Sequence, residues 1–308
     1  HHNFDPISSK GEGQNADGFG LHYQKSGPST VYRGCRAWWN SDDGFDCISQ
    51  GVAVVLDNCW MALSGYKPGT FVAAASGNGN GFKVGGWGNP PDGQPNPMPV
   101  HTVQNCMGFL NKAAGFYHNH QPGNGFYYNN TSFNNRSANY NMLGYKSGDV
   151  GMGTWRNNVS FGGTATSNAN GADAVNNSWN ISGLTLTAAD FLSVDTAGMF
   201  GPGGILGPRK ADGSLPDIKL MRPSPNSKLI DKGVDVKLAF KGSAPDLGAF
   251  EFEGTTAIRI SPASAVSKSA IAMPEALIFD LAGRRLGQGS ADGLFRQVVT
   301  KAIPIPSR

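Results

Sequence analysis

Val31-Tyr-Arg-Gly-Cys-Arg-Ala-Trp-Trp-Asn40 is the stretch that decides the fold, because versions of it return along the chain. Related runs occur at Leu56-Asp-Asn-Cys-Trp-Met-Ala, Val103-Gln-Asn-Cys-Met-Gly-Phe, Tyr128-Asn-Asn-Thr-Ser-Phe and Trp155-Arg-Asn-Asn-Val-Ser-Phe. We align these runs at Cys35, Cys59, Cys106, Thr131 and Val159. The spacings are then 24, 47, 25 and 28 residues (59 − 35, 106 − 59, 131 − 106 and 159 − 131). A period near 24 residues with short β-compatible runs predicts a solenoid, here an all-β parallel β-helix.

The spacing of 47 residues predicts one enlarged coil, with insertions at about residues 65–77 and 86–99. Within the repeat, we expect the cysteines to be free, buried and stacked in an inward-facing ladder rather than joined in disulfides. The asparagines that precede the aligned positions are predicted to form a structural ladder at a turn. They are Asn58, Asn105, Asn130 and Asn158.

The composition agrees with a β-rich extracellular protein. The 308 residues include 43 glycines, only 15% are charged, and the net charge is +3. The sequence shows no run of Lys and Arg typical of nucleic-acid binding and no apolar stretch long enough for a membrane span. His1-His2-Asn-Phe-Asp does not resemble a signal peptide, so the start looks internal. We expect a monomer that is secreted or held at the cell surface.

A second repeat consists of a glycine followed by an aromatic residue. It occurs as Gly18-Phe19, Gly44-Phe45, Gly81-Phe82 and Gly115-Phe116, with Asn139-Tyr140 as a variant. The residue after the pair is Asp46 in one coil and Lys83 in the next, so these two are predicted to be neighbours about 4.8 Å apart. By the same alignment, Asp17 lies one coil below Asp43.

Asp42, Asp43 and Asp46 crowd three carboxylates into five residues. Asp, Asn and Gly are ordinary turn formers, which is the structural alternative for this stretch. With Asp17 added from the coil below, however, four carboxylates converge, and a hard cation would make that arrangement favourable. The sequence therefore predicts a Ca²⁺ site formed by Asp17, Asp42, Asp43 and Asp46.

Calcium suits the binding and neutralisation of an anionic oxygen, for which a uronic acid carboxylate is a good match. Neutralising that carboxylate makes the proton on the adjacent sugar carbon more acidic. Lys83, if neutral, is the predicted base that removes this proton, and the glycosidic oxygen on the next carbon then leaves by β-elimination. The alternative for Lys83 is a simple ion pair with the acidic cluster.

Three motifs together resemble polysaccharide lyase family nine. They are Asn15-Ala-Asp-Gly-Phe19, the run from Arg33 to Asp46, and Gly77-Asn-Gly-Asn-Gly-Phe-Lys-Val-Gly-Gly86; Pro245-Asp-Leu-Gly-Ala-Phe-Glu251 extends the match, which covers about residues 3–253. The resemblance implies a right-handed parallel β-helix, four calcium-binding aspartates at Asp17, Asp42, Asp43 and Asp46, and Lys83 as the Brønsted base. The family also contains lyases that act on rhamnogalacturonan. Its members usually carry several coils before the first motif, which suggests that N-terminal coils are missing here.

Three further cations are candidate substrate-binding residues. Arg33 and Arg36 are close in sequence to the acidic turn, and guanidinium groups suit carboxylate recognition. Lys112 is the third candidate. These side chains are expected to contact an acidic plant polysaccharide, either galacturonan or rhamnogalacturonan.

We expect two domains, a lyase domain at 1–253 and a linker with a tail at 254–308. The runs from Thr187 and Leu229 resemble the closing region of the same family and are expected to cover the last coil. The tail, with Ala276-Leu-Ile-Phe-Asp-Leu-Ala-Gly-Arg-Arg-Leu-Gly, is similar to C-terminal tails of secreted Bacteroidota proteins and predicts a small β appendage for export or surface retention.

The sequence thus predicts a calcium-dependent pectate lyase. A rhamnogalacturonan lyase of the same fold is one alternative. A galacturonan hydrolase would instead use Asp42, Asp43 and Asp46 as acid and base, without calcium or lysine. A non-catalytic β-helix adhesin would bind glycan or calcium without turnover.

Overall fold

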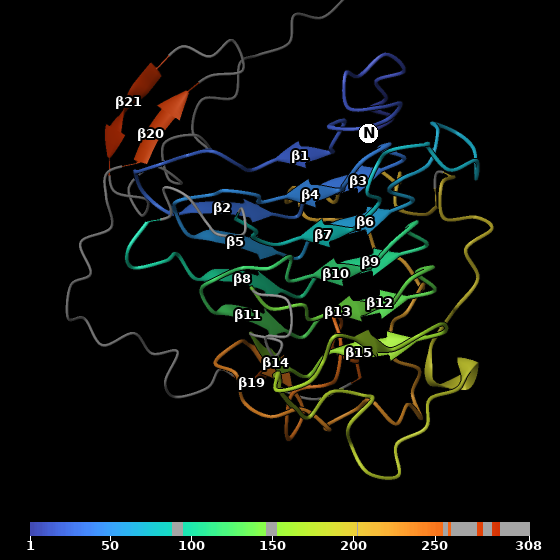
Figure 1. Cartoon of the computed structure of the whole chain (residues 1–308). Helices are drawn as coiled ribbons and strands as arrows, with labels where there is room; N and C mark the ends of the chain where they lie inside the picture. Colours follow the sequence, from blue (N-terminus) through green and yellow to red (C-terminus); the bar gives the residue numbers. More distant parts are fainter. Residues whose placement is uncertain are drawn as a thin grey trace, which may run out of the picture. The chain divides into compact units, whose positions relative to one another are not determined.

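Three parallel sheets form the body of the chain (Figure 1). The computed structural model describes residues 1–87, 95–145, 153–201 and 203–254, with the backbone of short strands beyond them. Sheet A contains β1 (Phe19–Gly20), β4 (Phe45–Asp46), β7 (Phe82–Lys83), β10 (Phe116–Tyr117), β13 (Tyr140–Asn141) and β16 (Thr166–Ser167). Sheet B contains β2 (Thr30–Arg33), β5 (Val54–Asp57), β8 (His101–Gln104), β11 (Gly125–Tyr128), β14 (Thr154–Arg156) and β17 (Asp173–Val175). Sheet C contains β3 (Arg36–Trp38), β6 (Trp60–Ala62), β9 (Met107–Phe109), β12 (Thr131–Phe133) and β15 (Val159–Phe161).

Each coil passes through sheet B, sheet C and sheet A in that order, and the next coil repeats the path one strand further along (Figure 1). The prediction of a parallel β-helix is confirmed. The enlarged coil is also confirmed, because long connections join β6 to β7 and β7 to β8. Part of the second insertion, residues 88–94, lies outside the described residues.

Strand pairing corrects the predicted register by one residue. Thr131 pairs with Met107, so the partner of Cys106 is Asn130 rather than Thr131. Asn58, Asn105, Asn129 and Asn157 share the preceding position and adopt positive φ values between 50° and 59°. Asparagine is among the few residues that tolerate this left-handed conformation. The Asn129-Asn130 and Asn157-Asn158 pairs made the alignment ambiguous. The first asparagine of each pair adopts the positive φ of the turn, and the second occupies the interior ladder.

The interior ladder therefore changes composition along the helix. It begins with Cys35, Cys59 and Cys106, all free thiols as predicted, and continues with asparagines. Asn130 Oδ1 accepts a hydrogen bond from the Cys106 amide at 3.0 Å, and Asn158 Oδ1 accepts one from the Asn130 amide at 3.0 Å. Each buried side chain thus satisfies the backbone of its neighbouring coil, which removes the cost of an unpaired buried amide.

The glycine and aromatic pairs stack in register on sheet A. Phe45 pairs with Phe19 and Phe82, and the rings of Phe45 and Phe82 are nearly parallel with centroids 5.0 Å apart. The aromatic rings face the buried interior, so the following residue faces outward. The glycine is required by a close approach of coils, since a Cβ on Gly81 would lie only 2.5 Å from the carbonyl oxygen of Gly115.

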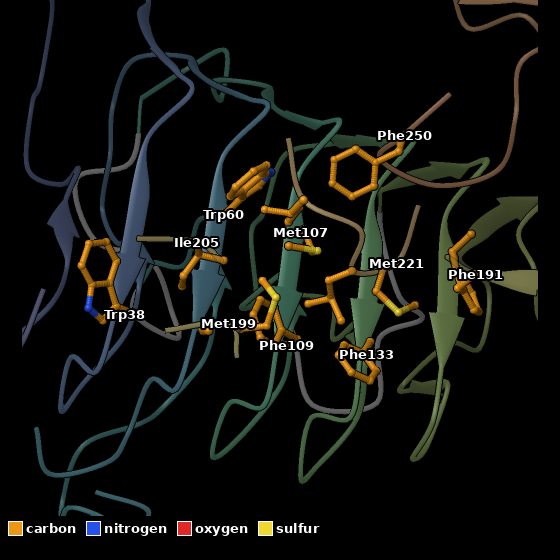
Figure 2. Packing of buried hydrophobic residues seen from close by; sticks show 14 of the residues in the cluster. Trp38, Trp60, Met107, Phe109, Phe133, Phe191, Met199, Ile205, Met221 and Phe250 are labelled. Atoms are coloured by element: carbon orange, nitrogen blue, oxygen red, sulfur yellow. The ribbon is translucent and has the colours of Figure 1, made fainter. Parts of the chain in front are cut away.

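A long covering segment, residues 184–201 and 203–253, packs against the outer face of sheet C (Figure 2). Trp60, Met107 and Phe133 lie on consecutive strands of that sheet, and Met221 and Phe250 of the segment pack in the same buried cluster. The segment contains one short 3₁₀ helix, η1 (Ala188–Asp190), and few other regular elements. The runs from Thr187 and Leu229 contact the last coils as expected, since Phe191 packs on Phe161 of β15 and the amide of Val234 donates a hydrogen bond to Asn157 Oδ1. The segment also extends to the first coils, because Arg36 in β3 donates hydrogen bonds to the carbonyl groups of Ile205 and Gly207. The apolar outer face of sheet C extends over all five strands, and the segment buries this face along its length.

The chain separates into two compact units, 1–264 and 265–308. In the first unit, β18 (Phe240–Lys241) of the covering segment pairs antiparallel with β19 (Ile258–Arg259), which lies in the predicted linker. The second unit contains β20 (Ala276–Phe279) and β21 (Arg285–Gly289), which pair antiparallel. Nothing more of the predicted tail lies within the described residues, and its role in export or retention stays a prediction. In the described part of the chain, no helix has the length and apolarity needed to cross a membrane.

Candidate functional site

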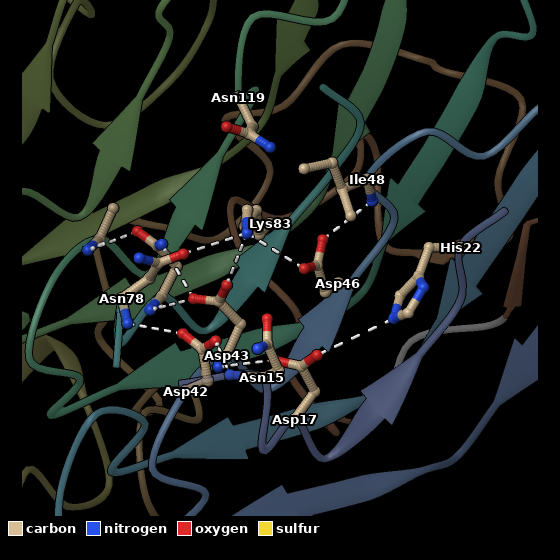
Figure 3. Close-up of polar contacts among 12 residues, drawn as sticks. Asn15, Asp17, His22, Asp42, Asp43, Asp46, Ile48, Asn78, Lys83 and Asn119 are labelled. Atoms are coloured by element: carbon tan, nitrogen blue, oxygen red, sulfur yellow. Dashed lines mark hydrogen bonds and ion pairs between the residues drawn. The ribbon is translucent and has the colours of Figure 1, made fainter. Parts of the chain in front are cut away.

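The acidic turn connects β3 on sheet C to β4 on sheet A. Asp42, Asp43 and Asp46 lie there beside Asp17 and Lys83 (Figure 3). The equivalences predicted from the sequence are confirmed in the strand pairing. Asp46 pairs with Lys83, and Gly20 pairs with Asp46. The amide of Asp43 donates a hydrogen bond of 2.9 Å to Asp17 Oδ1, so Asp17 lies against the acidic turn from the coil below.

Asp17, Asp43 and Asp46 form a carboxylate cluster in which one oxygen from each residue lies within 4.8 Å of the others. Burial is high, since the side chains of Asp43, Asp46 and Asp17 are 0%, 8% and 10% exposed. Lys83 Nζ lies 3.0 Å from Asp43 Oδ2 and 3.0 Å from Asp46 Oδ2. Asp43 Oδ2 is nevertheless not aligned to accept a hydrogen bond from any described residue. This buried oxygen already contacts one cation, the Lys83 ammonium, and keeps lone pairs that a metal ion could use.

The cluster carries more negative charge than its protein partners compensate. Burial raises the pKa of Asp17 to about 8, and repulsion by Asp43 and Asp46 adds to the effect. Burial also raises the pKa of Asp43, against the opposing effect of Lys83. Because both carboxyl groups resist ionisation, a divalent cation between them would relieve repulsion and desolvation together. The three carboxylates therefore fit a hard cation such as Ca²⁺, which prefers oxygen ligands.

Lys83 is an ammonium group in this arrangement. Burial lowers the pKa of Lys83, but Asp43 and Asp46 raise it by more, so the net shift is upward. Asn78 Oδ1 also accepts a hydrogen bond of 3.1 Å from Lys83 Nζ. The ion pair that is the alternative for Lys83 is therefore present, and the amine lies directly beside the carboxylate cluster. The role of Lys83 as a base stays a prediction.

Asp42 is placed differently from the other three aspartates. Its Oδ2 accepts a hydrogen bond of 2.6 Å from the amide of Asn15, and its Oδ1 accepts one of 2.6 Å from the amide of Asn78. The side chain therefore joins the loop of the coil below to the loop of the coil above. Asp42 is not part of the three-carboxylate cluster, and its role as a metal ligand stays a prediction.

Asn78 and Asn80 are site residues that the sequence reasoning missed. Asp43 Oδ1 accepts hydrogen bonds from the amide and the side chain of Asn80, at 2.7 and 2.9 Å. Asn80 precedes the Gly81-Phe82 pair and so occupies the same position as Asp17 and Asp43 in successive coils. Extending that alignment by one coil would have found it. His22 was also missed; its Nε2 lies 4.0 Å from Asp17 Oδ2.

Arg33 and Arg36 are not brought to the cluster. They flank the turn between β2 and β3, whereas the acidic residues lie beyond β3. Arg33 forms an ion pair of 2.8 Å with Asp57, and Arg36 is bound to carbonyl groups of the covering segment. Their substrate contacts stay predictions that this placement does not favour.

Lys112 lies beside the site and acts on a loop rather than on the carboxylate cluster. Its ammonium donates hydrogen bonds to the carbonyl groups of Ala74 and Gly77, at 2.7 and 2.8 Å. Those residues begin the loop that carries Asn78 and Lys83. Lys112 therefore holds the loop that presents Lys83, and its predicted contact with substrate is untested.

We expect Lys112→Met to lower the free energy of unfolding by about 2 kcal/mol, because two hydrogen bonds from a charged donor are lost. Urea unfolding followed by tryptophan fluorescence measures the change. Lys67→Met is the matched control, since Lys67 forms a partly exposed ion pair with Glu12 and its loss should cost less than about 1 kcal/mol. Equal losses in both variants would contradict the anchoring role of Lys112.

Comparison with known families and proteins gives consistent matches. Residues 1–158 match the family model described as Pel9A-like, right handed beta helix region. The chain is 42% identical over 253 residues to pectate lyase L of Dickeya chrysanthemi, covering 82% of this chain and 54% of that protein. It is 30% identical over 235 residues to pectate lyase PEL9 of Emericella nidulans, covering 70% and 53%.

Solved structures agree with these matches. The crystal structure of pectate lyase Pel9A superposes with a TM-score of 0.64 at 40% identity, covering 78% of this chain and 55% of that one. A rhamnogalacturonan lyase superposes with a TM-score of 0.63 at 35% identity, covering 73% and 56%. The chain thus spans about half the length of the relatives it matches.

Proposed function

Because this chain belongs to the Pel9A-like right-handed β-helix family, polysaccharide lyase family nine, we propose that it is a calcium-dependent pectate lyase. Its substrate is galacturonan, cleaved by β-elimination. The observation that carries the proposal is the register of Asp46 and Lys83 on adjacent strands, with Lys83 Nζ 3.0 Å from carboxylate oxygens of Asp43 and Asp46. The carboxylates that would bind the cation are therefore in direct contact with the candidate base, Lys83.

Asp17, Asp43 and Asp46 are the residues that would hold the ion, with Asp42 fixing the loops on either side. When bound, Ca²⁺ would neutralise the uronate carboxylate of the substrate and make the neighbouring C–H bond more acidic. The chain's own contribution is to keep these three carboxylates in place with backbone and asparagine donors, so that little reorganisation is needed on binding.

The proton is removed by Lys83 in its neutral form. Burial favours the neutral amine, whereas Asp43 and Asp46 favour the ammonium. Neutralisation of these two carboxylates therefore favours the amine that can accept a proton. The C–H bond breaks as Nζ takes the proton, and its electron pair forms the new C=C bond. The bond from the next carbon to the glycosidic oxygen breaks with its electron pair on that oxygen, which takes a proton from solvent. Asn78, in contact with Nζ at 3.1 Å, limits the positions of the amine.

A rhamnogalacturonan backbone is the second candidate substrate, because a rhamnogalacturonan lyase is among the structural neighbours. Both reactions create a carbon–carbon double bond that absorbs in the ultraviolet. The deciding experiment incubates the chain with each polysaccharide, with and without a chelator, and records that absorbance together with reducing ends. Reducing ends without absorbance would instead mean hydrolysis by paired aspartates, and binding without any product would mean an adhesin.

We expect the stabilisation by calcium to increase with pH. Asp17 has a pKa of about 8 in the folded chain, far above the ordinary 3.8. The folded chain therefore keeps a proton that the unfolded chain loses near pH 4. The carboxyl group's contribution to stability is complete below pH 4 and is lost as the pH rises through about 8. Calcium must displace this proton, so the rise in Tm caused by calcium should be larger at pH 8.5 than at pH 6.5.

Differential scanning fluorimetry at the two pH values, with calcium or with chelator, measures this difference. Magnesium at the same concentration is the control, because its demand for short octahedral contacts suits this cluster less well. A calcium effect of equal size at both pH values would contradict the role given to Asp17.

Galacturonan and rhamnogalacturonan are extracellular polymers of plant walls. A protein that cleaves them acts outside the cell that makes it, so we extend the proposal to a secreted or surface-held enzyme. Immunodetection of the protein in culture medium and in cell fractions tests this location.

A further inference from the structure

A row of outward-facing residues runs across sheet A through the proposed catalytic centre. Strand pairing places its members in register on six successive coils. They are Gly20, Asp46, Lys83, Tyr117, Asn141 and Ser167. Because adjacent strands are about 4.8 Å apart, a polymer that passes Lys83 along the helix axis meets Tyr117 next. Residues 88–94 and 146–152 lie outside the part of the chain that the structure describes.

Tyr117 differs from the other tyrosines near the row. Tyr140 is fully buried, and its hydroxyl donates to backbone carbonyl groups. The hydroxyl of Tyr127, also buried, is hydrogen-bonded to His118. Tyr117 is only half-buried, its ring contacts His120 edge-on at 6.2 Å, and its hydroxyl has no hydrogen-bond partner among the described residues. A half-buried phenol without a partner is an available donor and acceptor beside the proposed base.

The opposite end of the row has a different shape. Gly20 carries no side chain, and the imidazole of His22 fills the space beside it, 2.6 Å from where a Cβ would lie. The two sides of Lys83 therefore offer a substrate different contacts. An aromatic ring with a free hydroxyl lies on the β10 side, and an imidazole beside Asp17 lies on the β1 side.

We propose that Tyr117 is a substrate-binding residue that contacts the sugar next to the one deprotonated by Lys83, on the β10 side. Its hydroxyl forms a hydrogen bond with that sugar, and its ring supplies apolar contact. This inference rests on the proposed lyase function. It adds the orientation of the bound polysaccharide, which lies across the strands of sheet A rather than along one strand.

The test compares Tyr117→Phe and Tyr117→Ala with the unaltered chain on the polysaccharide it cleaves. One hydrogen bond between neutral groups corresponds to about a threefold to tenfold change. We expect Tyr117→Phe to raise KM by that factor with kcat nearly unchanged, because the contact is made equally in the ground and transition states. Tyr117→Ala should raise KM further. The Tm rise caused by calcium should be the same in all three chains, since Tyr117 is not a ligand.

Tyr128→Phe is the matched control, because Tyr128 is a partly buried tyrosine on sheet B that stacks on Phe126. It should leave KM unchanged. An unchanged KM in both Tyr117 variants, with an active unaltered chain, would overturn the role of Tyr117 and leave the lyase proposal intact. A loss of the calcium effect in Tyr117→Phe would show that the residue supports the metal seat and would also overturn the inference. Absence of elimination by the unaltered chain would overturn the lyase proposal itself.

Discussion

Lys83→Ala is expected to lower the rate of elimination on galacturonan by about a thousandfold, because a positioned general base contributes on the order of 10²–10⁴. Lys83 Nζ lies 3.0 Å from a carboxylate oxygen of Asp43 and 3.0 Å from one of Asp46. No other lysine among the described residues forms an ion pair with these two aspartates. The ultraviolet absorbance of the unsaturated product gives the rate. Stabilisation by calcium should persist or increase, since the variant removes a cation from the carboxylate cluster.

Lys83→Arg separates the charge of Lys83 from its basicity. The guanidinium keeps the positive charge but stays protonated at any working pH, so it cannot accept a proton. We expect Lys83→Arg to lose about as much of the rate as Lys83→Ala. Activity in Lys83→Arg close to that of the unaltered chain would show that position 83 supplies only charge, and the base would then have to be sought elsewhere.

Asp17→Asn is expected to abolish most of the response to calcium and with it most of the elimination. The asparagine oxygen can still accept the hydrogen bond from the Asp43 amide, so the turn should be preserved. One anionic ligand is lost, however, and the Tm rise at millimolar calcium should fall to near zero. A ligand at a hundred times its Kd stabilises by about 2.7 kcal/mol, which is the effect that should disappear.

The same variant carries a second expectation of opposite sign. Asp17 is a buried carboxyl group whose pKa is raised to about 8, so its ionised form destabilises the calcium-free chain at alkaline pH. Asp17→Asn should therefore be more stable than the unaltered chain at pH 9 in the presence of chelator. Asp173→Asn, on an exposed side chain paired with Arg156, is the control and should show neither effect. A lower Tm for Asp17→Asn under these conditions would contradict the electrostatic description of the site.

Much of this arrangement follows from the sequence because a solenoid converts sequence spacing into spatial proximity. Once the Gly-Phe pairs were aligned, the neighbours of Asp46 and Asp43 were determined by register alone. Side-chain direction was less predictable. Asp42 and Asp43 are adjacent in sequence, yet backbone amides from two loops draw the Asp42 carboxylate away from the cluster.

Contacts outside the repeat were the least predictable. Arg36 is six residues from Asp42 in sequence (42 − 36), but Arg36 begins strand β3 whereas Asp42 lies beyond its end, and the arginine is held by residues 205 and 207. Residues 205 and 207 lie in a segment without a sequence repeat, so repeat spacing could not predict their contact with Arg36. The Asn-Asn pairs show a different limit, because two identical neighbours do not reveal which one faces the interior.

The covering segment also has a consequence for how the molecule unfolds. A solenoid held only by contacts between successive coils can open gradually from either end, since each repeat is stabilised by its neighbours. Here one segment is bound near the first coils through Arg36 and near the last through Phe191, which packs on Phe161 in β15. Because the covering segment is attached at both ends, it couples distant coils, so the end coils cannot fray independently. The same contacts raise the average sequence separation of contacting residues, which slows folding while making unfolding more cooperative.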